Sequence, residues 1–302
     1  MILVDIGNSG LRACKSNCDN RVDYISAKIF GPVVKLSWSS IGQKISKHRP
    51  EPAESENRRW THIDDAQGYE WLVKQVTSQE HPVDGVIWRI GSVNRKALEH
   101  LVEAIEKNAK FAPRETPIIY QVINHRLVGI EAQVDYPEKV GIDRLLAARA
   151  ANAWNESRSR SEGRSVRSPV IVVQAGTALT VDWIDAQGRF QGGSILPGAG
   201  LALQYLAAGT DQLPWLPTDS IDRLPALPGK NTEEAIAAGV HASLVGGVRY
   251  LVERYRQEIG GKSEIPVVIS GGDGRLVLEH IAAPATYVEN LVLLGLALCE
   301  PL

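Results

Sequence analysis

Two short stretches of this chain, about one domain apart, repeat one pattern, and that repeat constrains the fold more than any other feature. The first runs from Ile2 to Asn8 and the second from Ile171 to Thr177. Each has an apolar strand, a polar residue, any residue, a glycine and a small hydrogen-bonding residue, followed by more β-like sequence. A Rossmann fingerprint and a P-loop both need a helix directly after the turn, so the pattern excludes them. The sequence instead predicts two strand–turn–strand units.

Such a unit is suited to holding phosphate. The glycines of the two turns, Gly7 and Gly176, allow close backbone approach, and consecutive backbone N–H groups can line a concavity that fits phosphate oxygens. A carboxylate at the strand end, such as Asp5, can hold a hydrated divalent cation bound to those phosphates. Two such hairpins facing each other would clamp a triphosphate from both sides. The alternative is a pair of unrelated β-turns.

Length and composition predict a two-domain globular protein. The chain has 302 residues, of which 44% are apolar and 23% charged, and its formal net charge is −2. That charge does not suggest a nucleic-acid binder, and no apolar run is long enough to span a bilayer. The start shows no signal-peptide pattern, and three cysteines without a framework fit a reducing cytoplasm. We expect a cytoplasmic protein with no nucleic-acid or membrane partner.

Alternating strand and helix patterns predict an α/β fold. The domain boundary is expected near residues 125–137, which gives domains of 1–126 and 127–302. Expected helices cover Asn94 to Ala109 and Pro137 to Trp154, and a long helix opens at Asn231 with Glu234 completing a capping box. Residues Asn155 to Ser168 are expected to form a polar surface loop. A strand over 22–30 and a helix over 39–48 are also expected.

A third motif lies at Gly141 to Arg144, at the start of the helix that precedes the second hairpin. Asp143 and Arg144 would supply a base and a fixed cation side by side near a helix N-terminus. Taken alone, the pair is better explained by a helix-start Asp favoured by the helix dipole and a surface Arg.

The order of the motifs along the chain resembles the type III pantothenate kinases, also called Bvg accessory factors. The resemblance covers essentially the whole chain and has five parts. These are DxGN(S) at Asp5 to Ser9, GxDR at Gly141 to Arg144, GTAxTxD at Gly176 to Asp182, GGxxxPG at Gly192 to Gly198 and NTxE at Asn231 to Glu234.

The resemblance implies a duplicated actin-like (ribonuclease H-like) ATPase fold, with two domains and the active site in the cleft. It implies ATP-dependent phosphorylation of pantothenate to 4′-phosphopantothenate, the first step of coenzyme A synthesis, by a homodimer. The implied cofactors are ATP, Mg²⁺ and a monovalent cation, K⁺ or NH₄⁺.

The resemblance also implies roles for individual residues. Asp143 is the expected base that accepts the proton of the pantothenate hydroxyl. The expected substrate-binding residues are Gly141, Ile142, Asp143, Arg144 and Thr232, of which Thr232 is a candidate for a contact from the partner subunit. The expected ATP-binding residues are Asp5, Ile6, Gly7, Asn8, Ser9, Gly10, Leu11, Arg12 and Thr177. Asp5 is expected to bind the divalent cation through the phosphates.

Three positions depart from the family pattern. Gln174 stands where the family carries an Asp that ligates the monovalent cation; Gln keeps a carbonyl oxygen but loses the charge. A substrate-contacting Tyr is replaced by Val134, with Tyr136 two residues out of register. Ser9 in place of Thr keeps the hydroxyl. Gln174 leaves open a second hypothesis, a weakened or non-catalytic nucleotide-binding paralogue that acts as a regulator. A third is a kinase or phosphatase of the same fold acting on another substrate, against which the GxDR motif argues.

Overall fold

The computed structural model describes residues 1–16, 33–37, 61–62, 66–77, 87–109, 119–163, 168–221, 225–260 and 265–299. The chain divides into two compact units. Unit 1 contains residues 1–129, 141–143 and 296–302, and unit 2 contains residues 130–140 and 144–295. The expected division at 126 and 127 does not anticipate the two later segments that return to unit 1. The expected strand over 22–30 and helix over 39–48 lie outside the described residues.

Unit 1 is built on a six-stranded sheet with the order β4-β3-β2-β1-β5-β6. The strands are β1 (Ile2–Ile6), β2 (Gly10–Lys15), β3 (Val34–Ser37), β4 (Thr61–His62), β5 (Ile87–Ser92) and β6 (Ile119–Val122). The first three strands form an antiparallel meander, while β5 and β6 run parallel to β1. Helices α1 (Ala66–Thr77) and α2 (Arg95–Ala109) supply the apolar side chains that pack with β1 in one core. The expected helix over 94–109 is confirmed as α2.

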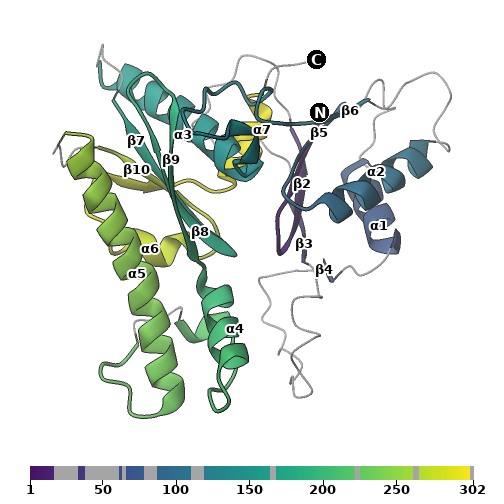
Figure 1. Cartoon of the computed structure of the whole chain (residues 1–302). Coiled ribbons are helices and arrows are strands. Elements are labelled where there is room, and N and C mark those ends of the chain that lie inside the picture. The colour runs from purple at the N-terminus through teal and green to yellow at the C-terminus, as the bar shows by residue number, and fades with distance from the viewer. Residues whose placement is uncertain are drawn as a thin grey trace. The chain divides into compact units, whose positions relative to one another are not determined.

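Unit 2 repeats this topology in a five-stranded sheet with the order β11-β10-β7-β8-β9 (Figure 1). The strands are β7 (Val170–Ala175), β8 (Ala178–Ile184), β9 (Phe190–Pro197), β10 (Val267–Ser270) and β11 (Ala285–Tyr287). Here too an antiparallel meander comes first and two strands parallel to its first strand follow. In both sheets the five core strands therefore have the order 3-2-1-4-5, which confirms the expected duplicated α/β fold.

The helices of unit 2 form two layers around its sheet. Helices α4 (Ala199–Gly209), α5 (Thr232–Glu258) and α6 (Gly274–Leu278) pack with alternate residues of β7 in one large core. Helices α3 (Ile142–Ser161) and α7 (Leu291–Ala297) lie on the opposite side of the sheet (Figure 1). Short 3₁₀ turns occupy Pro137–Lys139 and Thr218–Ile221. The parallel strands of this sheet are thus covered on both faces, as such sheets require.

Helix α3 corrects two expectations. It begins at Ile142 rather than Pro137, because a 3₁₀ turn and an extended Val140 precede it, and it continues to Ser161. The first half of the expected polar loop is therefore helical. Asn155 is only 3% exposed and donates to the carbonyl of Ser168 over 2.7 Å. Polar residues without Gly or Pro do not stop a helix.

Helix α5 begins as the capping box predicts. The Asn231 side chain accepts a hydrogen bond of 2.8 Å from the backbone N–H of Glu234. By length and composition α5 is the one helix among the described residues that could cross a membrane, but half of that window is buried inside unit 2. Core helices commonly have this character.

Candidate active site

The first glycine turn connects β1 to β2 and places a buried acid at its edge. The turn is closed by a hydrogen bond of 2.8 Å from the Gly7 N–H to the Gly10 carbonyl. Asp5 lies in β1 opposite Arg12 in β2, and Arg12 Nε is 4.0 Å from Asp5 Oδ2. Asp5 is 7% exposed, so its carboxylate has lost most of its water.

That burial raises the pKa of Asp5 to about 6 from an ordinary value of 3.8. Loss of water is the largest cause, the positive charge of Arg12 opposes it, and the negative charge of Asp143 adds to it. A carboxylate held in this way gains strongly from an arriving cation.

Asp143 belongs to the same compact unit as this turn. It lies in the first turn of α3 and, with Gly141 and Ile142, is clustered with unit 1. Its electrostatic effect on Asp5 shows that the structure brings the expected base near the expected phosphate turn. No local sequence pattern indicates this proximity, because 138 positions separate the two acids along the chain.

The acids of this region fit a magnesium ion bound together with phosphate. No group of three His, Cys, Asp or Glu side chains among the described residues could hold a metal alone. Mg²⁺ in phosphate sites needs only one or two protein carboxylates, since water and phosphate oxygens complete its shell. Asp5, buried and short of positive charge, has the character of such a ligand.

The second glycine turn connects β7 to β8 and is neutral. Gly176 N–H donates to the Ala178 carbonyl over 3.2 Å. Gln174 takes the place that Asp5 has in the first hairpin, and its partner across the hairpin is Thr180, where the first hairpin has Arg12. Both charges of the first hairpin are therefore replaced by uncharged groups in the second.

Close backbone contacts brace the second turn. A Cβ atom on Gly198 would lie 1.9 Å from the Gly176 carbonyl oxygen. Gly271 has a φ of +100°, and a Cβ there would lie 2.2 Å from the Ala175 carbonyl oxygen. Only glycine fits at these two positions. Thr177 lies in the turn that they surround.

Arg144, the second residue of the GxDR pair, lies in unit 2 and forms an ion pair with Asp182 of β8. Its Nε donates to both carboxylate oxygens at 3.1 and 3.2 Å, and its Nη2 also donates to Oδ1. The Arg144 guanidinium carbon lies 5.5 Å from the centre of the Phe190 ring. The sequence reasoning did not assign Asp182 a role, although it ends the GTAxTxD motif.

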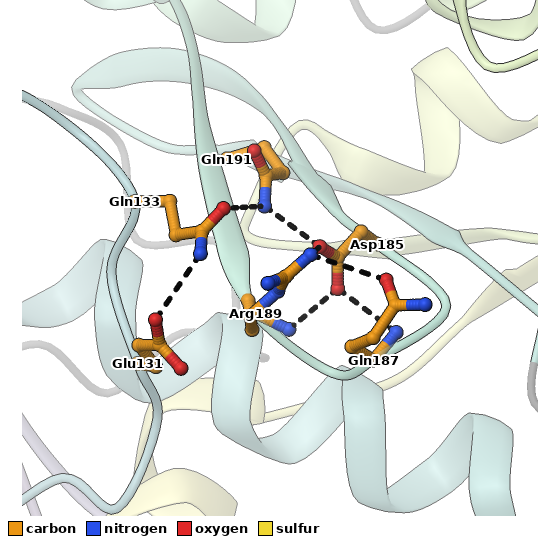
Figure 2. Close-up of polar contacts among 6 residues, drawn as sticks. All are labelled: Glu131, Gln133, Asp185, Gln187, Arg189 and Gln191. Carbon is orange, nitrogen blue, oxygen red and sulfur yellow. Dashed lines mark hydrogen bonds and ion pairs between the residues drawn. The ribbon is translucent and has the colours of Figure 1, made fainter.

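The segment before GxDR is attached to β9 by backbone and side-chain contacts. The Phe190 N–H donates to the Glu131 backbone carbonyl, and the Gln133 N–H donates to the Phe190 carbonyl, both over 2.8 Å. Figure 2 shows the polar network beside these bonds, which joins Glu131, Gln133, Asp185, Gln187, Arg189 and Gln191. Further along, Tyr136 is 58% exposed and carries the Lys139 ammonium 4.1 Å above its ring.

Thr232, the remaining expected substrate residue, is the first residue of α5. It lines a largely apolar cavity of about 680 Å³ between α4 and α5, within unit 2. Tyr205 and Ile236 are among the other residues of its wall. Thr232 and Arg144 thus belong to unit 2, whereas Asp5 and Asp143 belong to unit 1.

Comparison with known proteins identifies the family. A sequence model of the family described as type III pantothenate kinase matches residues 34–254. The type III pantothenate kinase of Rhodopirellula baltica is 38% identical over 214 residues, which cover 70% of each chain. That of Laribacter hongkongensis is 33% identical over 204 residues, which cover 67% of this chain and 78% of the relative.

Solved structures with a similar course of the chain include a Baf family transcriptional activator from Campylobacter jejuni. It is 20% identical with a TM-score of 0.49, and 98% of this chain and 96% of that one are covered. The acetate kinase of Entamoeba histolytica is 10% identical with a TM-score of 0.48, at 98% coverage of both chains. These two likenesses are too distant to add to the sequence match. The match over 34–254, together with the duplicated sheet and its ordered motifs, shows that the chain belongs to the type III pantothenate kinase family.

Proposed function

We propose that this protein catalyses the ATP-dependent phosphorylation of pantothenate to 4′-phosphopantothenate, the first step of coenzyme A biosynthesis. The observation that carries the proposal is the family match over residues 34–254. The negative charge of Asp143 acts on Asp5, which supports the proposal. A phosphoryl transferase needs its base close to the acid that holds the phosphate-bound cation.

Asp143 is the proposed base. Phosphoryl transfer passes through a loose transition state, so the attacking hydroxyl loses its proton late and a carboxylate suffices to accept it. Asp143 receives this proton on a carboxylate oxygen. Gly141, Ile142, Arg144 and Thr232 are the proposed substrate contacts, with Arg144 pairing with the pantothenate carboxylate.

The first turn is the proposed phosphate-binding element. Backbone N–H groups of the turn from Asn8 onward meet phosphate oxygens, since the Gly7 N–H is used to close the turn, and Asp5 is the carboxylate that would hold the Mg²⁺ accompanying ATP. A Mg²⁺ ion bound there would neutralise charge on the transferred phosphoryl group. Thr177 supplies a contact to ATP from the second turn, and Gln174 offers a carbonyl oxygen to a monovalent cation.

The enzyme is further proposed to be a cytoplasmic homodimer in which Thr232 contacts the substrate bound to the partner subunit. The exposed side chains of Ile195, Tyr205 and Tyr250, all more than 60% accessible in the single chain, are apolar surface that a second copy would cover.

A second candidate function is a nucleotide-binding paralogue that no longer phosphorylates pantothenate. Gln174 is the observation in its favour, because the acid of the family is absent there.

A coupled ADP-release assay decides between the two. We expect pantothenate-dependent ADP release from the purified full chain, measured with K⁺, with NH₄⁺ and with neither ion. ATP binding without pantothenate-dependent turnover under any cation condition would favour the paralogue.

A further inference from the structure

The Arg144–Asp182 ion pair is buried and held by several hydrogen bonds, an arrangement that stability alone does not explain. Asp182 is completely buried, and the Nε–Nη2 edge of Arg144 meets both of its oxygens. Removing two charges from water costs about as much as their attraction returns, so a buried pair contributes little net stability. It does fix the plane and direction of the guanidinium, because the planar fork matches the carboxylate.

A glycine makes room for this carboxylate. Asp182 of β8 lies opposite Gly193 of β9. A Cβ atom on Gly193 would lie 2.3 Å from Asp182 Oδ1 and 2.2 Å from the Val181 carbonyl oxygen. Any other residue at Gly193 would displace the acid or the strand. Part of the GGxxxPG motif is therefore explained by the space that Asp182 needs.

The Phe190 ring also restricts the position of the Arg144 guanidinium. The ring is fully buried, and the Arg144 guanidinium carbon lies 5.5 Å from its centre. Phe190 is held in turn by two backbone hydrogen bonds with the segment that leads into GxDR: its N–H donates to the Glu131 carbonyl, and its carbonyl accepts from the Gln133 N–H. The Arg144 side chain is thus fixed by a carboxylate and by a ring, both on rigid strands.

The fixed orientation has a chemical consequence. A guanidinium presents two edges that can pair with a carboxylate, the Nε–Nη2 edge and the Nη1–Nη2 edge. Asp182 pairs with the first edge, so a substrate carboxylate that pairs with Arg144 would have to do so through the second. Arg144 follows directly after the proposed base, so its direction bears on where a substrate anion is held.

From these contacts we infer that Asp182, assisted by Phe190, is a positioning residue that directs Arg144 at the carboxylate of the substrate and thereby sets the preference for an anionic substrate. The inference rests on the proposed function and deepens it. Asp182 itself touches neither substrate nor ATP.

The test compares pantothenate with its neutral analogue, in which a primary alcohol replaces the carboxylate and the phosphorylated hydroxyl is unchanged. The ratio of kcat/KM for the two substrates is measured in the wild type and in Asp182→Asn, which keeps the shape and removes the charge. We expect the ratio to fall at least tenfold in Asp182→Asn, through a higher KM for pantothenate, with the KM for ATP within twofold of the wild type. A general structural defect would lower both substrates alike.

Asp185→Asn is the matched control, since it removes another acid–arginine pair from the same hairpin, that of Asp185 and Arg189. Its ratio should stay within twofold of the wild type. If Asp182→Asn does not fold, Phe190→Leu decides, with an expected fall of about two- to fivefold.

Three results would overturn the inference: a folded Asp182→Asn with an unchanged ratio, an unchanged ratio in Phe190→Leu, or an equal fall in Asp185→Asn. A wild type that turns over neither substrate would instead overturn the proposed function, and this inference with it.

Discussion

The two glycine turns occupy the same place in their sheets, but the first carries charged side chains and the second does not. Each follows the central strand of a sheet with the order 3-2-1-4-5, and each is closed by a backbone hydrogen bond from its glycine, Gly7 or Gly176. The first places Asp5 and Arg12 across its hairpin, and the second places Gln174 and Thr180 at the same register. The two hairpins therefore share their place in the sheet but differ in charge and in turn length, since residues 7–10 separate the last strand pair of the first and residues 176–178 that of the second.

The two turns also differ in how closely the surrounding backbone packs against them. The second turn is enclosed by Gly198 and Gly271, both of which approach its carbonyls more closely than a side chain would allow. The first turn carries a buried acid whose pKa is raised to about 6, which is a cost to folding. We conclude that the first turn is specialised for charge and the second for shape.

The largest effect is expected at the proposed base, because the chemical step depends on the acids of the unit that contains the first turn. Asp143→Asn should lower kcat by about a thousandfold, the range of general-base catalysis, while a non-hydrolysable ATP analogue binds as before. Steady-state kinetics and calorimetry measure the two. Asp135→Asn, an exposed acid shortly before GxDR, is the control and should stay near wild type. Turnover retained in Asp143→Asn would refute the assignment.

Asp5→Asn should separate catalysis from stability in the first turn. Loss of the metal-binding carboxylate is expected to lower kcat/KM for ATP about a hundredfold. The pKa of Asp5 in the folded chain lies above 3.8, so folding favours its protonated form. The stability linked to this group is full below about pH 3.8 and is lost as the pH rises towards 6.

The same variant should therefore unfold with a higher free energy than the wild type at pH 7, by up to about 3 kcal/mol. The difference should shrink below pH 4. Denaturant unfolding at both pH values measures it, and a variant that is less stable at pH 7 would contradict the buried-charge account.

The pH dependence of the wild type sharpens the same point. As the pH falls through about 6, Asp5 becomes protonated and loses the charge that its proposed role as a cation ligand requires. We expect kcat/KM for ATP to drop about tenfold for each further pH unit. A profile that stays flat down to pH 5 would show that the ionisation of Asp5 does not matter for ATP use.

The smallest effect is expected from restoring the acid in the second turn. Gln174→Asp should lower the K⁺ concentration for half-maximal activity by about tenfold, because a charged ligand replaces a neutral one. Gln174→Asn keeps the position neutral and is the matched control. Equal K⁺ responses in the two variants would place the cation elsewhere. A large gain of activity in Gln174→Asp would identify the natural chain as a weakened kinase.

The sequence predicted the duplicated fold well, because both central strands and their glycine turns are local patterns. The helix start at Asn231 was also predictable, since a capping box is set by residues three apart. The length of α3 was not predictable in the same way. Its polar C-terminal part includes Asn155, which is buried and donates a hydrogen bond to the Ser168 carbonyl, 13 residues further along the chain.

The pairings within the candidate site could not be predicted from spacing. Arg144 and Asp182 are 38 residues apart, and their contact depends on how α3 packs on the sheet. Gly193 belongs to one of the sequence motifs. The reason for a glycine there is the room that the Asp182 carboxylate needs, and this follows only from the register of β8 and β9. Long-range side-chain contacts of this kind follow from tertiary packing.

The central claim is that a chain with one charged and one neutral turn is a working pantothenate kinase. The most direct measurement is mass spectrometry of the product formed from ATP and pantothenate by the purified full chain, with Asp143→Asn as the blank. We predict 4′-phosphopantothenate in an amount equal to the ADP released, and about a thousandth as much from the variant in the same time. ADP release with no phosphorylated pantothenate, or equal product from the variant, would contradict the account.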